Sequence, residues 1–320
     1  MNYRNFYEFE EYYSIPLSEK KYDEVLNILL HAKELLPKDE YEENLFELMI
    51  DESRIYTQTN NSESCINLIK KSLEKGYPFP LHWPNFDLLR NHPEYESLNN
   101  LNTKLLHQAK ENSKLQYEVH LPKSYDPTKK YPLFLCLHGD GFHCNIKNTS
   151  WYWKPDALLE KGYIVVYPQS SQMYFHNSFG WLSDPTLSRK ELKDCYEQLL
   201  LDYSIDETCV LFGGFSGGAT TSIDVAFHNT IPIKGVIALC HGDYLDIIGL
   251  EDTKKLSERK TKIVILEGDQ KTDPVVQHLL KIFKEVGLAY EYHINKGIGH
   301  WYPENLDEKT LKAVEFIVNN

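Results

Sequence analysis

The sequence predicts an α/β domain with a mostly parallel sheet, preceded by an all-helical N-terminal domain. Tyr131–Leu137 is a continuous apolar run of the kind found in a parallel sheet covered on both faces, and residues 162–168 read as a second buried strand. The first 114 residues lack such runs and show helical patterning instead. We therefore expect a helical domain at residues 1–114 and an α/β domain at residues 115–320.

The N-terminal domain shows several segments with helical periodicity. They occupy residues 22–36, 41–56, 63–75 and 93–110. Four positions in the second and third segments approximate the spacing of tetratricopeptide repeats: Tyr56, Cys65, Ile69 and Ser72. Two interpretations stay open. One is a degenerate array of helical hairpins that recruits a protein partner, and the other is a helical cap that buries apolar surface of the α/β domain.

Composition and charge exclude several classes of protein. The 320 residues are 42% hydrophobic and 25% charged, which is enough to fill one large core and a smaller one. The net charge of −13 repels phosphate backbones and anionic lipid headgroups, so we expect neither nucleic-acid binding nor membrane attachment. The sequence shows no apolar region of a signal peptide and no apolar run approaching 18 residues, so we expect a cytoplasmic protein.

The six cysteines follow no regular spacing. We expect them to be reduced and mostly buried, because a free thiol inside a strand or helix behaves as a small apolar side chain. His138, His143 and Cys144 lie close together in the sequence, but their spacing matches no zinc motif. The sequence therefore predicts no metal site, and His138 is expected to hold a turn by hydrogen bonds.

A glycine-rich turn carries the candidate nucleophile. Residues 209–212 read as a strand and residues 219–228 as a helix, and Ser216 lies between them with glycines at positions 214 and 218. This is the G-x-S-x-G pattern, in which the glycines leave room where a Cβ would clash and the strained turn lifts the serine Oγ clear of the backbone. Because the pattern also recurs by chance, its meaning depends on the residues around it.

An acidic residue and a histidine follow Ser216, each after a strand-like run. Residues 262–266 lead into a loop with Asp269 and Asp273, and residues 290–294 lead into a loop with His300. The order serine, aspartate, histidine distinguishes one serine hydrolase fold from the others. The sequence thus predicts a catalytic triad of Ser216, His300 and one of the two aspartates.

The strand-like run Tyr131–Leu137 ends in the loop 138–141, of sequence His-Gly-Asp-Gly, which can aim a backbone N–H at the same site. The N–H of Asp140 and that of Gly217, the residue after the nucleophile, would form an oxyanion hole. Such a pair of donors stabilises the charge that develops on a tetrahedral intermediate. We expect Asp140 to act through its backbone alone.

With these motifs, residues 115–320 resemble the α/β-hydrolase superfamily, and within it the bacterial serine esterases related to the phospholipase/carboxylesterase and feruloyl-esterase-like groups. The resemblance implies an α/β-hydrolase fold for this domain. The matching segments are residues 121–127 and 130–132 before the His-Gly-Asp-Gly loop, residues 203–206 before the predicted strand 209–212, the G-x-S-x-G turn at residues 214–218, called the elbow here, residues 273–276, and residues 299–300.

The loop after residues 262–266 departs from the family pattern. The acid usually lies about three residues after a glycine at the strand end, whereas Asp273 is five residues beyond Gly268. Asp269 is therefore a rival for the role of triad acid. We favour Asp273 because the Pro-Val-Val that follows it matches the family pattern and can start the next helix.

The predicted activity is hydrolysis of a small-molecule carboxylic ester. Ser216 would attack the carbonyl carbon, His300 would pass the serine proton to the leaving alcohol, and Asp273 would fix the His300 tautomer. Water would then release the acyl group, and these steps require no cofactor.

Three aromatic residues are candidates for an acyl pocket, because they follow predicted strands at the end of the sheet where substrates bind: Trp181, Phe215 and Trp301. Two other functions stay open. One is a peptidase or aminoacyl hydrolase on the same fold, and the other is a non-enzymatic scaffold whose helical domain recruits a partner.

Overall fold

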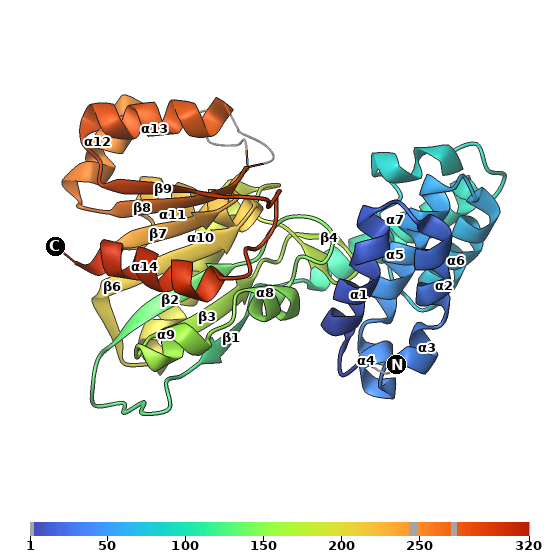
Figure 1. Cartoon of the computed structure of the whole chain (residues 1–320), viewed down its shortest axis with the longest axis horizontal. Helices are drawn as coiled ribbons and strands as arrows, with labels where there is room; N and C mark the ends of the chain where they lie inside the picture. The colour runs from blue at the N-terminus through green and yellow to red at the C-terminus, as the bar shows by residue number, and fades with distance from the viewer. Residues whose placement is uncertain (1–2, 243–248, 270–273, 320) are drawn as a thin grey trace. The chain divides into compact units, whose positions relative to one another are not determined.

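The computed structural model describes residues 3–242, 249–269 and 274–319, which divide into two compact units (Figure 1). The helical unit comprises Met1–Ser113 and Met173–Asn177, and the sheet unit comprises Lys114–Gln172 and Ser178–Asn320. The segment Met173–Asn177 thus lies in the helical unit, although it belongs to the middle of the chain.

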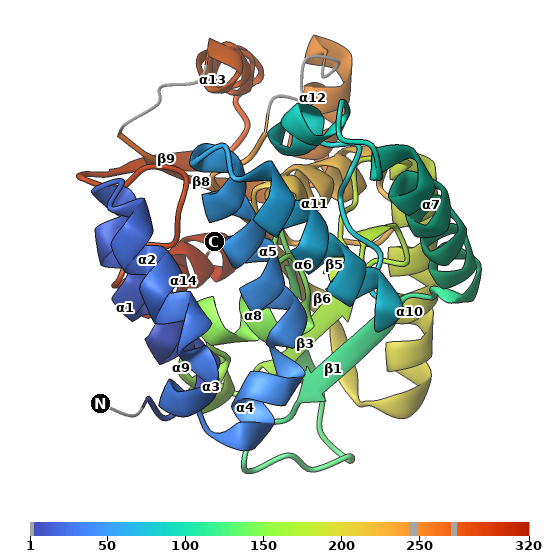
Figure 2. The ribbon, with the colours of Figure 1, turned by 90° about the vertical axis from the view of Figure 1, so that its right-hand side faces the viewer.

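The helical unit contains a helix in each segment that shows helical periodicity. α2 (Tyr22–Leu30) and α3 (Ala32–Leu35) divide the first of these segments at His31. The sequence analysis did not anticipate α1 (Phe6–Ser18), which buries Phe6, Phe9 and Tyr13. The others are α4 (Lys38–Glu43), α5 (Leu45–Gln58), α6 (Ser62–Glu74), the 3₁₀ helix η1 (Pro84–Leu89) and α7 (Tyr95–Asn112). α5 and α6 lie side by side (Figure 2).

A seven-stranded sheet forms the centre of the sheet unit, in the order β1-β3-β2-β6-β7-β8-β9. Only β1, at one edge, runs antiparallel to its neighbour, so the sheet is mostly parallel, as predicted. The strands of this unit are β1 (Gln116–His120), β2 (Tyr131–Leu137), β3 (Ile164–Gln169), β5 (Ser178–Phe179), β6 (Ile205–Phe215), β7 (Gly235–Leu239), β8 (Lys262–Gly268) and β9 (Tyr290–Asn295). Strand β4 (Met173–Phe175) lies in the helical unit.

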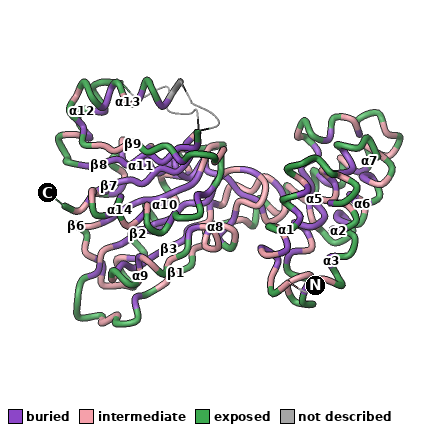
Figure 3. Tube along the Cα trace, viewed as in Figure 1, coloured by how far each residue is buried: buried purple, intermediate pink, exposed green. Residues whose placement is uncertain are grey.

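Helices cover both faces of this sheet, and its central strands are buried along most of their length (Figure 3). On one face pack α10 (Pro185–Asp202), α11 (Gly217–His228), α12 (Leu250–Glu258) and α13 (Pro274–Val286). On the other pack α8 (Ile146–Tyr152), α9 (Asp156–Glu160) and α14 (Leu306–Val318). None of the helices in the described part of the chain is both long enough and apolar enough to cross a membrane.

The carboxyl ends of parallel strands meet at one edge of a sheet, and ligands bind there in open α/β folds. The loops after β2, β6, β8 and β9 therefore lie together at the end of the sheet where these strands finish. They carry Asp140, Ser216, Asp269 and His300, respectively.

Candidate active site

Ser216 occupies a strained turn between β6 and α11. Its φ of +53° and ψ of −118° lie outside the regions that residues with a side chain ordinarily adopt, and such a conformation costs about 1–3 kcal/mol. The turn is held in place on one side by β7, because the Ser216 N–H donates to the Leu239 carbonyl at 2.9 Å. The serine side chain is half-buried, so its Oγ is reachable.

The glycines on either side of the serine are required by close backbone contacts, as the sequence predicted. A Cβ on Gly214 would lie 2.4 Å from the carbonyl carbon of Gly218. A Cβ on Gly218 would lie 2.3 Å from the carbonyl oxygen of His138. Side chains at these positions would push the elbow away from the strands that position it.

His300 reaches Ser216 from the loop after β9. Its Nε2 lies 2.9 Å from Ser216 Oγ, the distance expected between a serine nucleophile and its general base. The loop before His300 also packs tightly against the end of β8, where a Cβ on Gly268 would lie 2.2 Å from the Gly299 carbonyl oxygen. The sequence analysis singled out both residues, and the fold brings their side chains within hydrogen-bond distance.

Of the two candidate acids, Asp269 is described and holds the histidine loop. Its carboxylate accepts the Gly297 N–H at 2.9 Å, and its own N–H donates to the Ile298 carbonyl at 3.1 Å. Asp273 lies outside the described residues, directly before α13. Its role as the triad acid therefore stays a prediction, while Asp269 has a defined structural role.

The two expected oxyanion donors, Asp140 and Gly217, are neighbours in space. A Cβ added to Gly217 would lie 2.1 Å from Asp140 Oδ1. The Asp140 carboxylate accepts the backbone N–H groups of Trp181 at 2.9 Å and Leu182 at 3.1 Å. Asp140 thus has a side-chain role that the sequence analysis did not anticipate: its carboxylate fixes the loop that carries its backbone N–H.

His138 and Trp181 form the buried support of this loop. The Ser170 N–H donates to His138 Nε2 at 3.2 Å, so Nδ1 carries the proton and donates to the Gly139 carbonyl at 2.6 Å. Burial lowers the pKa of His138 to about 4, which keeps the ring neutral. The Trp181 ring stacks on His138 at 4.7 Å between centroids, and its Nε1–H donates to the His138 carbonyl. The expectation that His138 holds a turn is confirmed.

Trp181 was expected to line an acyl pocket, but its side chain is fully buried. It packs against the loop of residues 138–141, called the oxyanion loop here after its expected role, instead of presenting a surface to solvent.

The other two expected aromatic residues lie beside His300. The Phe215 ring is 5.0 Å from the His300 ring between centroids, and Trp301 is 48% exposed. Two tyrosines that the sequence analysis did not single out complete the group. Tyr302 stacks on Tyr152, from α8, at 5.0 Å, and Tyr152 packs against Trp301 at 5.1 Å. His300 thus has an aromatic wall beside it, formed by Tyr152, Phe215, Trp301 and Tyr302.

Solved structures share this architecture at low sequence identity. An uncharacterized protein from Bacillus cereus ATCC 10987 is 22% identical and has a TM-score of 0.53, over 98% of this chain and 99% of that one. A ferulic acid esterase is 17% identical with a TM-score of 0.50, over 64% of this chain and 92% of its own. The dipeptidyl peptidase 4 of Porphyromonas gingivalis is 14% identical with a TM-score of 0.50, over 64% and 33%. The sheet unit has the α/β-hydrolase fold.

Sequence comparison adds little to this result. No family model matches the chain. A probable dipeptidyl-peptidase 5 of Aspergillus terreus is 34% identical over 56 residues, which is 18% of this chain and 8% of that protein. The α/β-hydrolase fold therefore rests on the structure, and the proteins of similar fold include both an esterase and a peptidase.

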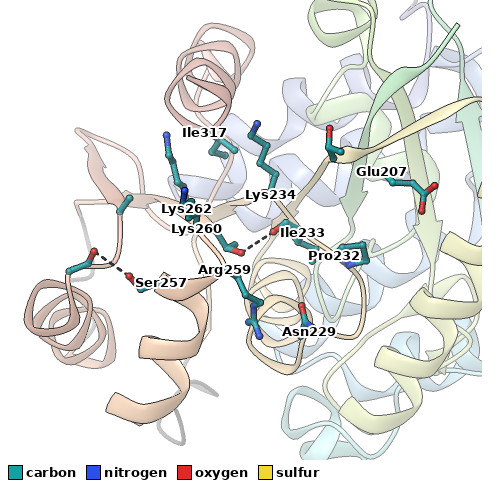
Figure 4. A pocket seen from close by; sticks show the side chains of 14 residues that line it. Glu207, Asn229, Pro232, Ile233, Lys234, Ser257, Arg259, Lys260, Lys262 and Ile317 are labelled. Atoms are coloured by element: carbon teal, nitrogen blue, oxygen red, sulfur yellow. Dashed lines mark hydrogen bonds between the residues drawn. The ribbon is translucent and has the colours of Figure 1, made fainter. Parts of the chain in front are cut away.

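A hollow of about 750 Å³ lies at the other end of the α/β-hydrolase sheet, where β6 to β9 begin (Figure 4). Several cations line it, but two of them cap helices. Arg259 donates to the Ala226 carbonyl at 2.6 Å, at the end of α11, and Lys262 donates to the Phe316 carbonyl at 2.8 Å, at the end of α14. These two cationic side chains offset the partial negative charge at the C-termini of the helices. The hollow lies at the opposite end of the strands from Ser216, so it is separate from the candidate active site.

Proposed function

We propose that the protein is a serine hydrolase that cleaves small carboxylic esters. The observation that carries this proposal is the 2.9 Å separation of Ser216 Oγ and His300 Nε2 at a strained elbow. The hydrolase part of the proposal also draws on the α/β-hydrolase fold of the sheet unit.

In the proposed mechanism, Ser216 Oγ attacks the ester carbonyl carbon while His300 Nε2 takes its proton. The N–H groups of Asp140 and Gly217 donate to the oxyanion, and the tetrahedral intermediate collapses when His300 returns the proton to the leaving alcohol. Water then attacks the acyl-serine by the same sequence, with His300 as base. Asp273 would hold the His300 ring in the tautomer that leaves Nε2 free to accept a proton.

The aromatic wall favours substrates that carry an apolar or aromatic group next to the scissile ester bond. Trp301 exposes about half of its surface immediately after the general base, and Phe215 immediately precedes the nucleophile. Phe215 is itself buried, so such a group would pack on the exposed ring of Trp301 and gain binding energy roughly in proportion to the apolar area covered.

A peptidase or aminoacyl hydrolase is the second candidate, because one protein of similar fold is named a dipeptidyl peptidase and a protein that matches 56 residues of this chain is named a probable dipeptidyl-peptidase. The helical N-terminal part speaks against it, since prolyl-oligopeptidase-like enzymes carry a β-propeller at that position. The cytoplasmic location expected from the sequence stays part of the proposal.

A panel of p-nitrophenyl acyl esters beside aminoacyl p-nitroanilides tests the assignment. We expect turnover of the esters alone, and loss of that turnover in Ser216→Ala. Turnover of the anilides would contradict the ester assignment in favour of the peptidase. A folded protein that cleaves neither set would favour the scaffold.

A further inference from the structure

The segment Met173–Asn177, called the strap here, packs into the helical unit although the chain on both sides of it belongs to the sheet unit. Phe175 of the strap is buried, with its ring edge-on to Trp83 at 5.2 Å and tilted against Phe46 at 6.1 Å. Both partners precede Phe175 by more than 90 residues in the sequence. The aromatic side chains of the helical unit thus surround a segment that comes from the middle of the chain.

The next two strap residues add polar and stacking contacts. The His176 ring stacks on Tyr77 at 4.0 Å with 20° between the planes, and the His176 N–H donates to the Pro78 carbonyl at 3.0 Å. Asn177 Nδ2 donates to Glu47 Oε1. These contacts fix both the direction and the register of the strap within the helical unit.

The residues before the strap are bound to the oxyanion loop and its surroundings in the sheet unit. The Ser170 N–H donates to His138 Nε2 at 3.2 Å. Gln172 Nε2 donates to Ser188 Oγ at 2.7 Å, and the Gln172 carbonyl accepts the Gly180 N–H at 3.0 Å.

The residues after the strap are bound to the same loop. Ser178 Oγ donates to the Gly141 carbonyl, and the Phe179 N–H donates to the Cys144 carbonyl at 3.0 Å. Two residues further on, the Trp181 N–H donates to the Asp140 carboxylate. The oxyanion loop is therefore held by the chain on both sides of the strap.

We propose that the strap is a positioning element of the active site: by binding Phe175 and His176, the helical unit sets the place of the Asp140 N–H in the oxyanion hole. The proposal rests on the proposed function, because it assumes that Asp140 acts as an oxyanion donor. It assigns the helical unit a positioning role, which it exerts through the strap that it encloses.

The test compares three full-length variants. Phe175→Ala removes the anchor of the strap, and Phe175→Leu keeps most of its apolar volume. Phe9→Ala is the matched control, because Phe9 is also fully buried in the helical unit but packs against Tyr3 and Tyr13. The readouts are kcat and KM for a p-nitrophenyl ester, and the hydrogen-exchange rate of residues 138–142.

We expect Phe175→Ala to lower kcat roughly 10–100-fold with KM changed less than about threefold, because misplacing a catalytic group by about 1 Å costs up to about 10²-fold. Amides of residues 138–142 should exchange faster in this variant. Phe175→Leu should restore most of kcat, and Phe9→Ala should behave like the wild type in both readouts. Where Phe175→Ala does not fold, His176→Ala provides the same test by removing only the stacked ring.

Wild-type kcat and exchange in Phe175→Ala would overturn the proposal, and so would equal effects of Phe9→Ala. The exchange measurement does not depend on substrate. A wild-type protein that cleaves no ester would contradict the proposed function, whereas faster exchange of residues 138–142 confined to Phe175→Ala would still support the mechanical coupling.

Discussion

His300 Nε2 lies 2.9 Å from Ser216 Oγ although 84 residues separate them in the sequence. Two features of the fold produce this distance. The elbow holds the serine at the end of β6, and the loop that carries the histidine is bound to the end of β8 through Asp269 and Gly268.

The elbow should tolerate no side chain at Gly214. Gly214→Ala places a Cβ 2.4 Å from backbone atoms of Gly218, so the strand or the helix must shift, and we expect a loss of about 2–3 kcal/mol in the free energy of unfolding. Gly242→Ala is the control, because its Cβ would lie at an ordinary 3.6 Å from Thr220 Oγ1. Urea unfolding of both variants checks this, and equal losses would show that the elbow is not closely packed.

The acid of the triad should be Asp273. Asp273→Asn is expected to lower kcat by about 10⁴-fold with little change in stability, because the histidine is then left in the wrong tautomer. Asp269→Asn should lower kcat less than about tenfold, since the amide oxygen can still accept the Gly297 N–H. Steady-state kinetics of the two variants, measured side by side, decide between them, and the reverse ranking would move the acid to Asp269.

Removal of the Asp140 carboxylate should lower kcat much more than it weakens substrate binding. Asp140→Ala removes the acceptor of the Trp181 and Leu182 N–H groups, and we expect kcat to fall roughly 10²-fold with KM nearly unchanged. Asp206→Ala is the control, because its carboxylate also accepts a backbone N–H, that of Thr208, but at the exposed beginning of β6. A kcat of Asp140→Ala within twofold of wild type would contradict the role of this carboxylate.

His138 should make the protein less stable in acid. Its folded pKa of about 4 lies below the ordinary 6.5, so the unfolded chain binds a proton that the native ring resists. Stability is therefore lost as the pH falls from about 6.5 towards 4, by about 3 kcal/mol, with no further loss from this group below that range. His138→Gln should show a smaller loss between pH 7 and pH 4.5 in urea unfolding. Equal losses in the free energy of unfolding of wild type and variant over this pH range would show that His138 is not the cause.

The parallel strands, the elbow and the histidine could be predicted because each depends on a local pattern. Tyr131–Leu137 is apolar throughout because both faces of its strand are covered, and the glycines beside Ser216 are needed by the turn itself. Helix α1 was not predicted, and Pro16 interrupts its helical pattern near the C-terminal end.

The strap, the buried Trp181 and the Asp140 carboxylate could not be predicted in this way. Met173–Asn177 contains the aromatic residues Tyr174 and Phe175, but its own sequence does not show where they pack. The partners Phe46 and Trp83 are identified only by the packing of the helical unit. Trp181 and Asp140 likewise meet across 41 residues, so their sequence neighbourhoods carry no signal of the hydrogen bond between them.

The most direct test of the central claim is labelling of the full-length protein with a fluorophosphonate, followed by intact mass and peptide mapping. The account predicts one adduct per chain, on Ser216, because among the serines in the described part of the chain it is the one at the elbow with a histidine Nε2 at hydrogen-bond distance. Ser216→Ala should remain folded, take up no label and lose at least roughly 10³-fold in kcat. Labelling that persists in Ser216→Ala, or that maps to another serine, would contradict the assignment.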